Sequence, residues 1–297
     1  MPKGRLYELT PTISLWFEDR IPFVYTSNEI GALLEEKRIE WQIPTYINSE
    51  RFLRFLMENT ALEQLLVQST GERYRPDLIR YIWGRTDPFL LGTSLKPRSY
   101  CSHSSALVLH GLTDQLPQTL FLTTPQRRTY PVDKRELTQK ALDKVFSKKQ
   151  RESQSAYRAL GYRYVLLEGA FTQPGDVDEV TLESSRMPVA VSSLERTLID
   201  IVVRPSYSGG VVQVLEAYKA AHGRINIERM NHLLHRLSYT YPYQQSIGFL
   251  LSKAGYADKE IKPFVESVTP LNFYLAYGLL EKVFIPKWKL YVPRGFE

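Results

Sequence analysis

Reactive residue types gather in the stretch YCSHSSALVLHGLTDQLPQTLFLTT, residues 100–124. It contains Cys101, the only cysteine of the chain, together with His103 and His110. Such a set suggests nucleophilic catalysis or metal binding. However, two histidines on one helix share a metal ion at a spacing of three or four residues, and here the spacing is seven. No GxSxG, P-loop or GxGxxG motif is found in the chain. We therefore interpret the stretch as scaffold and predict no catalytic residue, no metal site, no cofactor and no enzymatic activity.

A different chemistry is indicated by residues 127–163, which hold eleven Lys or Arg and four Asp or Glu, a net charge of +7. The whole chain has a net charge of only +6, so the excess is local. A concentrated positive charge favours polyanionic partners. The alternative is a solvated loop whose charge serves solubility. The candidate DNA contacts within this segment are Arg127, Arg128, Lys144, Lys148, Lys149 and Arg151.

Composition narrows the class of protein. Apolar residues make up 43% of the 297 residues and aromatic residues 12%, which is typical of a globular chain with a core. No apolar run of 18 residues occurs, so we expect no membrane span. The first residues lack the apolar centre of a signal peptide, and one cysteine cannot form an intrachain disulfide. We therefore expect a cytoplasmic location.

The N-terminal part of the chain begins with three predicted helices. The first covers residues 13–20, and the second follows TSNE at 26–29, a capping box formed by Thr26 and Glu29. The third is NSERFLRFLMEN, residues 48–59, capped by Asn48 or Ser49. Two strands follow, separated by a turn near residues 69–73. This order is that of a winged helix-turn-helix, which we predict for residues 1–95.

A recognition helix presents its N-terminal residues to base edges in the major groove. Ser49, Arg51 and Arg54 occupy that position on the third helix, and Arg73 and Arg75 flank the predicted wing tip. Arginine makes bidentate contacts to guanine or binds phosphate. We expect these residues to bind double-stranded DNA. The long connection at 38–48 and the net charge of −1 over residues 1–85 speak for the alternative, a protein-docking module.

Residues 96–297 are predicted to form a larger mixed α/β domain with a helical C-terminal part. Strands are expected at QTLFLTT and YRYVLLEG, with DEVTLES paired beside the latter. SSLERTLIDIVV is predicted as a helix with a Ser192–Glu195 capping box and an Arg196–Asp200 pair. Three further helices follow in succession, and the Tyr-rich tail is strand-like. The predicted fold class is therefore α+β.

Three blocks carry a resemblance to a known family: the stretch at 100–124, PVAVSSLERTLIDIVVRPSYSGGVVQVLEAYK at 188–219, and YPYQQSIGFLLSKAGY at 241–256. They resemble the AbiEi family, the antitoxins and transcriptional regulators of type IV toxin–antitoxin systems. The resemblance covers about residues 20–256. It implies a promoter-binding winged helix, a C-terminal antitoxin domain without catalysis, and a nucleotidyltransferase-like toxin as the functional counterpart. It also implies that Arg196 belongs to a structural block, with a toxin-facing or DNA-facing role as the alternative.

Two hypotheses follow. The chain is a DNA-binding antitoxin that represses its own operon, or it is an interaction module whose basic surface docks on an acidic partner. A nucleic-acid enzyme fits poorly, because the chain offers no evident catalytic set.

Overall fold

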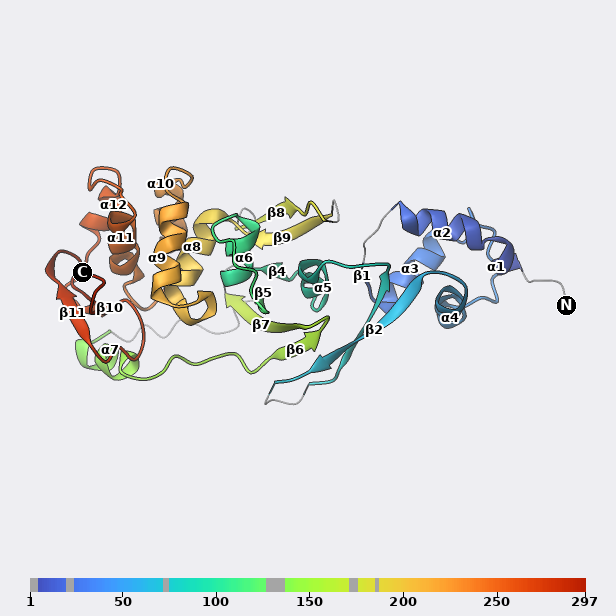
Figure 1. The fold of residues 1–297 in the computed structure, drawn as a ribbon, viewed down its shortest axis with the longest axis horizontal. Helices are drawn as coiled ribbons and strands as arrows, with labels where there is room; N and C mark the ends of the chain where they lie inside the picture. Colours follow the sequence, from blue (N-terminus) through green and yellow to red (C-terminus); the bar gives the residue numbers. More distant parts are fainter. Residues whose placement is uncertain (1–4, 20–23, 72–74, 127–136, 171–175, 185–186) are drawn as a thin grey trace.

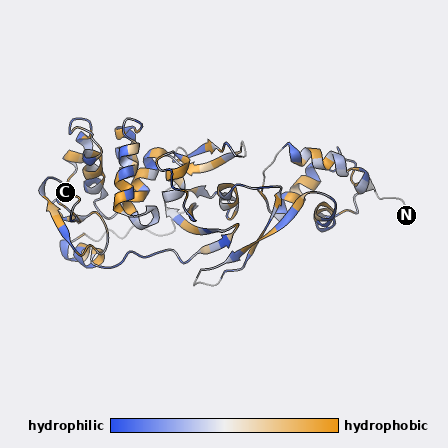
Figure 2. Ribbon diagram, viewed as in Figure 1, coloured by the Kyte–Doolittle hydropathy of each residue, from blue (hydrophilic) through white to orange (hydrophobic). Residues whose placement is uncertain are grey.

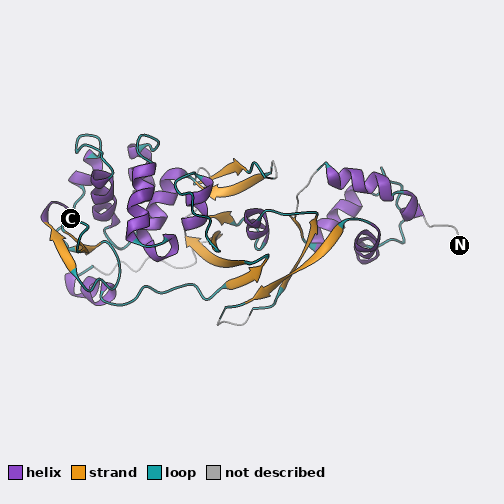
Figure 3. Cartoon of the chain, in the orientation of Figure 1, coloured by secondary structure: helices purple, strands orange, loops and turns teal. Residues whose placement is uncertain are grey.

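The computed structural model describes residues 5–19, 24–71, 75–126, 137–170, 176–184 and 187–297. Helices and strands are both abundant, which confirms the α+β class. Figure 1 shows an elongated arrangement, with a helical N-terminal unit at one end, strands in the middle and a helical C-terminal part at the other end. Figure 3 makes the same division visible by element type. In Figure 2 hydrophobic and hydrophilic residues alternate along the helices, as expected where one face of a helix packs on a core.

The N-terminal unit packs its described helices, the short α1 among them, against a small antiparallel sheet. Local sequence explains both main helices: Thr26 and Glu29 form the predicted capping box, and Asn48 accepts a hydrogen bond of 2.9 Å from the Arg51 amide. In the core, Phe17 stacks on Trp83 with ring centroids 4.5 Å apart. The elements are α1 (Arg5–Glu8), α2 (Thr10–Glu18), β1 (Val24–Tyr25), α3 (Ser27–Lys37), α4 (Ser49–Asn59), β2 (Leu62–Ser69) and β3 (Leu78–Trp83).

The long connection between α3 and α4 is a packed part of this unit. Trp41, Ile43 and Ile47 are buried in its core. The Arg38 guanidinium donates hydrogen bonds to the carbonyl oxygens of Pro44, at 3.0 Å, and Ile47, at 3.2 Å. The connection therefore fixes the approach of α3 to α4 and does not separate them.

The middle of the molecule is a nine-stranded sheet in the order β1-β3-β2-β6-β7-β5-β4-β9-β8. The predicted pairing of DEVTLES beside YRYVLLEG is wrong, because β7 already has β5 on one edge and β6 on the other, and β8 pairs with β9. The elements are α5 (Pro88–Ser94), β4 (Tyr100–Cys101), α6 (His103–Leu109), β5 (Thr119–Gln126), α7 (Gln139–Phe146), β6 (Ala156–Ala159), β7 (Tyr162–Ala170), β8 (Val177–Thr181) and β9 (Pro188–Ser192).

The hairpin of β2 and β3 joins the N-terminal unit to this sheet. The end of β2 pairs with β6 through Gln68 and Ser69, and the Thr70 amide donates to the Ala156 carbonyl oxygen at 2.9 Å. A Cβ atom at Gly71 would lie 1.9 Å from the Gln154 carbonyl oxygen, so the backbones meet closely there. The described end of the hairpin is thus part of the central sheet.

The C-terminal part is a helical core closed by a three-stranded sheet. Gln245, fully buried on α11, donates to the carbonyl oxygens of Trp288 and Lys289, both at 3.0 Å, and so ties the sheet to the helices. Residues 260–297, which lie beyond the sequence resemblance, thus form part of this C-terminal fold. The elements are α8 (Leu194–Val203), η1 (Pro205–Ser208), α9 (Val211–Ala220), α10 (Ile227–Leu237), α11 (Tyr243–Lys253), α12 (Lys262–Glu266), β10 (Phe273–Tyr274), β11 (Lys282–Ile285), η2 (Pro286–Trp288) and β12 (Leu290–Pro293).

Candidate nucleic-acid interface

The N-terminal end of α4 presents three predicted DNA contacts to solvent. Ser49, Arg51 and Arg54 are all exposed. The Arg54 guanidinium is 2.9 Å from the Glu50 carboxylate, an exposed pair one helical turn apart. Arg51 makes no ion pair with any described residue, so its guanidinium is available to a ligand. On α4, Arg51 can therefore bind a ligand directly, whereas Arg54 must first break its ion pair with Glu50.

The arginines predicted near the wing tip have a different position. Arg75 is half-buried and lines a cavity of about 670 Å³ whose other described walls come mainly from the central sheet, α8 and the connection after α10. Lys96, Arg151 and Arg204 line the same cavity. Arg73, Arg127 and Arg128 lie outside the described residues.

The basic segment contributes four predicted residues to one place. Lys144, Lys148, Lys149 and Arg151 all line a cavity of about 600 Å³, here called the basic cavity. Lys144 lies on α7, and the other three follow that helix in the connection that leads to β6. The described lining contains no carboxylate. A site of this kind attracts anions because nothing on its surface offsets the positive charge.

Sequence reasoning missed two further contributors to the basic cavity. Arg204, which follows α8, is the fifth cation of its lining. Tyr239, Tyr241, Tyr243 and Tyr277 supply its aromatic side. The run YTYPY at 239–243 was the available signal, because tyrosines beside cations are a common feature of nucleic-acid sites. Arg151, Arg204 and Tyr239 also line the 670 Å³ cavity, so the two hollows adjoin.

A buried ionic cluster lies on α8, next to the residues that line these cavities. Arg196 Nε donates to Asp200 at 2.8 Å, which confirms the predicted pair, and both side chains are less than 10% exposed. Asp176 also approaches Arg196, at 3.8 Å, and pairs with Arg236. Burial opposes the charged form of Arg196, but the Asp200 carboxylate outweighs it and the pKa of the guanidinium is raised.

The predicted capping box of α8 is wrong. Ser193, not Ser192, stands at the N-cap, and it makes no side-chain capping bond. The Ser192 hydroxyl lies 2.8 Å from that of Thr197, and the Glu195 carboxylate accepts from the Asn226 amide at 3.0 Å. Both residues are buried, and each has another partner: Ser192 contacts Thr197 within α8, and Glu195 contacts Asn226 from a distant segment.

The reactive residues of the opening stretch are held inside the fold. Cys101 is fully buried on β4, and burial raises the pKa of its thiol. His103 opens α6 with a positive φ of 51°, and its ring contacts Phe121 and Tyr207. His110 ends that helix, with Nε2 2.7 Å from the Ser192 carbonyl oxygen. Each of the three has a packing role.

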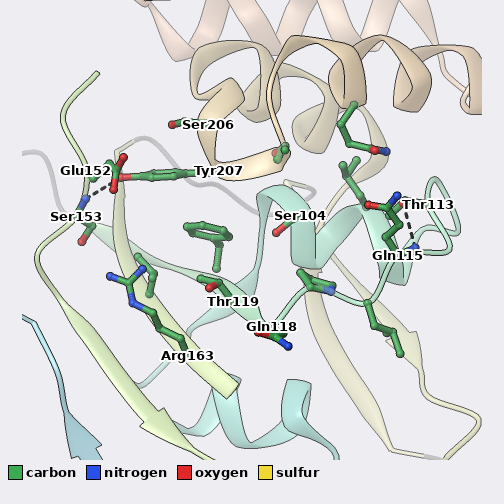
Figure 4. Close-up of a pocket in the computed structure, with 18 residues that line it drawn as sticks. Ser104, Thr113, Gln115, Gln118, Thr119, Glu152, Ser153, Arg163, Ser206 and Tyr207 are labelled. Atoms are coloured by element: carbon green, nitrogen blue, oxygen red, sulfur yellow. Dashed lines mark hydrogen bonds between the residues drawn. The ribbon is translucent and has the colours of Figure 1, made fainter. Parts of the chain in front are cut away.

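Figure 4 shows a third cavity, of about 500 Å³, beside α6. Its described lining includes Arg163, Glu152 and several hydroxyl and amide side chains but neither cysteine nor histidine. The Ser153 amide donates to the Tyr207 hydroxyl at 2.7 Å across one side of it. Within the described residues, no group of three His, Cys, Asp or Glu is arranged to hold a metal ion.

Acid is expected to weaken the fold through His103. Burial lowers the pKa of His103 from 6.5 to about 4, so between these values the unfolded chain takes up a proton that the folded chain refuses. Stability is then complete above about pH 6.5 and falls, by on the order of 3 kcal/mol, as the pH drops to about 4. Urea denaturation at pH 7 and pH 4.5 measures this loss. His103→Asn, which tolerates positive φ, should show a smaller loss.

The exposed His232 offers the matched control. His232→Asn should lose as much stability in acid as the unaltered protein. An equal acid loss in all three proteins would show that protonation of His103 does not cause it.

Comparison with known proteins gives the fold alone. No family model matches the chain, and no curated protein matches it. A solved structure, the crystal structure of the RV2827C protein from Mycobacterium tuberculosis, is similar with a TM-score of 0.55 and 15% identity. The match covers 97% of this chain and 90% of that one, so the N-terminal unit, the central sheet and the C-terminal helices share one arrangement. None of the described helices is both long and apolar enough to traverse a bilayer.

Proposed function

We propose that this protein is a sequence-specific repressor of its own operon and the antitoxin of a two-gene system, opposing a nucleotidyltransferase-like toxin. The observation that carries DNA binding is the N-terminal unit. Its elements run α2, β1, α3, α4, β2, β3, and its strands lie side by side in the order β1-β3-β2. This order supports the proposal of a winged helix in which α4 serves as the recognition helix.

In this proposal α4 reads bases through Arg51, with Arg54 and Ser49 beside it. The basic cavity supplies the electrostatic part of binding, since phosphate contacts position a protein on the duplex without reading its sequence. The described end of the β2–β3 hairpin is paired with β6, so the proposal gives the hairpin a joining role. This differs from the sequence-based expectation that Arg73 and Arg75, beside the wing tip, bind double-stranded DNA.

The antitoxin part of the proposal rests on the three resembling blocks. In the fold these blocks form β4 with α6, β9 with α8 and α9, and α11. They contact one another: α6 and α11 both pack on α8, and β4 pairs with β9. The resemblance therefore maps onto one connected scaffold. Loss of growth rescue when the neighbouring gene is expressed with a chain lacking this scaffold would agree with the antitoxin role.

Arg51→Ala tests the base-reading role. If Arg51 contacts a base, the variant should bind the duplex upstream of its own coding sequence more weakly by about 1–3 kcal/mol. Affinity for a scrambled duplex should change little. Fluorescence anisotropy with both duplexes at one salt concentration measures this difference.

Arg294→Ala is the control for Arg51→Ala. It removes the same charge from an exposed arginine that pairs with Glu281 and lies neither on α4 nor in the described lining of the basic cavity. It should leave both affinities unchanged. An Arg51→Ala variant that weakens both duplexes equally would mean that Arg51 touches phosphate only.

A further inference from the structure

The basic cavity is enclosed by segments that are far apart in the sequence. One side is the end of α7 with the following residues Lys148–Arg151, and a second is Val203–Arg204 at the end of α8. The connection between α10 and α11, residues 239–243, and Tyr277 complete it. The volume of about 600 Å³ falls within the range typical of small-molecule sites.

The cations of this cavity are largely unpaired among the described residues. The Arg204 guanidinium donates to the Arg151 carbonyl oxygen at 2.8 Å, which ties two sides together. Lys144 and Lys148 make no ion pair with a described residue, and Lys149 reaches the Glu152 carboxylate only at 3.8 Å. Compact ammonium groups around one hollow suit a phosphate group.

The tyrosines of the cavity are fixed by contacts among themselves and with Phe146. Tyr277 stacks on Phe146 with centroids 4.1 Å apart, and Tyr241 meets the same ring edge-on at 5.3 Å. Tyr239 packs edge-on against Tyr243, also at 5.3 Å. Tyr239, Tyr241 and Tyr277 are half-buried residues that line the basic cavity. Rings held in this way lose little freedom when a planar ligand stacks on them.

We propose that the basic cavity binds a nucleoside monophosphate unit, with its phosphate on the lysines and its base against the tyrosines. The unit is either a free nucleotide or the phosphorylated end of a single strand. The base of an intact duplex is already stacked and paired, so it cannot supply this contact. The site thus goes beyond duplex recognition by α4, and it stands whether or not the protein is a repressor.

Isothermal titration calorimetry with the full-length protein tests this site. The probes are AMP, ribose 5-phosphate and a 5′-phosphorylated adenosine hexanucleotide. Stacking of one base is worth about 1–3 kcal/mol, so AMP should bind at least about fivefold tighter than ribose 5-phosphate. Equal affinities of AMP and the hexanucleotide would assign the site to a free nucleotide, and tighter binding of the hexanucleotide would assign it to a strand end.

Variants separate the two halves of the site. Tyr239→Leu and Tyr241→Leu should bind AMP no better than ribose 5-phosphate, whereas Tyr239→Phe and Tyr241→Phe should keep the preference for AMP. Lys148→Met should weaken both ligands by a similar factor, and Lys219→Met on α9, outside the cavity, should weaken neither. Circular dichroism confirms that each variant is folded.

Two results would overturn the site. One is equal or undetectable binding of AMP and ribose 5-phosphate to the unaltered protein, which needs no variant. The other is unchanged AMP binding by the folded Leu variants. Anisotropy with the upstream duplex keeps this outcome apart from the proposed function, because the Leu variants should bind the duplex as before.

Discussion

Arg196→Met is expected to destabilise the protein by about 3–5 kcal/mol at pH 7. The substitution retains most of the side-chain volume but leaves the Asp200 carboxylate buried without its described partner. Asp176 stays paired with Arg236 in this variant, so the loss of stability comes from the unpaired Asp200. Urea denaturation measures the free energy of unfolding. The loss should shrink as the pH falls, because an unpaired buried carboxylate takes up a proton readily.

Two comparisons define this result. In the double variant Arg196→Met/Asp200→Asn the unpaired charge is removed, and a large part of the stability should return. Lys262→Met breaks an exposed pair with Glu266, at the same spacing of four residues on α12, and should cost less than about 1 kcal/mol. A loss below about 1 kcal/mol for Arg196→Met would show that the cluster does not hold α8 in place.

Changing Lys144, Lys148, Lys149 and Arg151 together to Ala should alter how DNA binding depends on salt. Each phosphate contact adds about −0.9 to the slope of log K against log salt concentration on duplex DNA. The variant should therefore flatten that slope by up to about 3–4 units if all four residues contact phosphates. Preference for the upstream duplex should survive, because α4 is intact. Anisotropy titrations at several salt concentrations measure the slope.

The control for the fourfold change removes the same charge elsewhere. Lys219, Lys259, Lys262 and Lys287 are exposed and line neither the basic cavity nor its neighbour. Their replacement by Ala should leave the slope almost unchanged. Equal flattening in both variants would indicate a general charge effect, and no flattening in the first would remove the basic cavity from the DNA contact.

The sequence was most informative where local chemistry determines structure. The capping box at Thr26 and the cap at Asn48 depend on residues three apart, so the helices that they begin could be predicted. The Arg196–Asp200 pair is likewise set by the helical spacing. The capping box expected at Ser192 failed because Thr197 and Asn226 bind its two members, and Asn226 belongs to a later helix.

The candidate site was only half visible in the sequence. Its cations form a dense run along the chain, and four of them line the basic cavity. Arg204 and Tyr277 come from distant segments, and contacts with Phe146, the stacking of its ring on Tyr277 among them, bring the latter to the cavity. The pairing of β2 with β6 joins the hairpin to the central sheet. It links residues almost ninety positions apart, so no local pattern predicts it.

The central claim is that this protein recognises a specific operator through its N-terminal unit. The most direct measurement is the affinity of the full-length protein for the duplex upstream of its own coding sequence and for a scrambled duplex, at one physiological salt concentration. The account predicts that the upstream duplex binds at least about a thousandfold more tightly. Equal affinity for the two duplexes would contradict it.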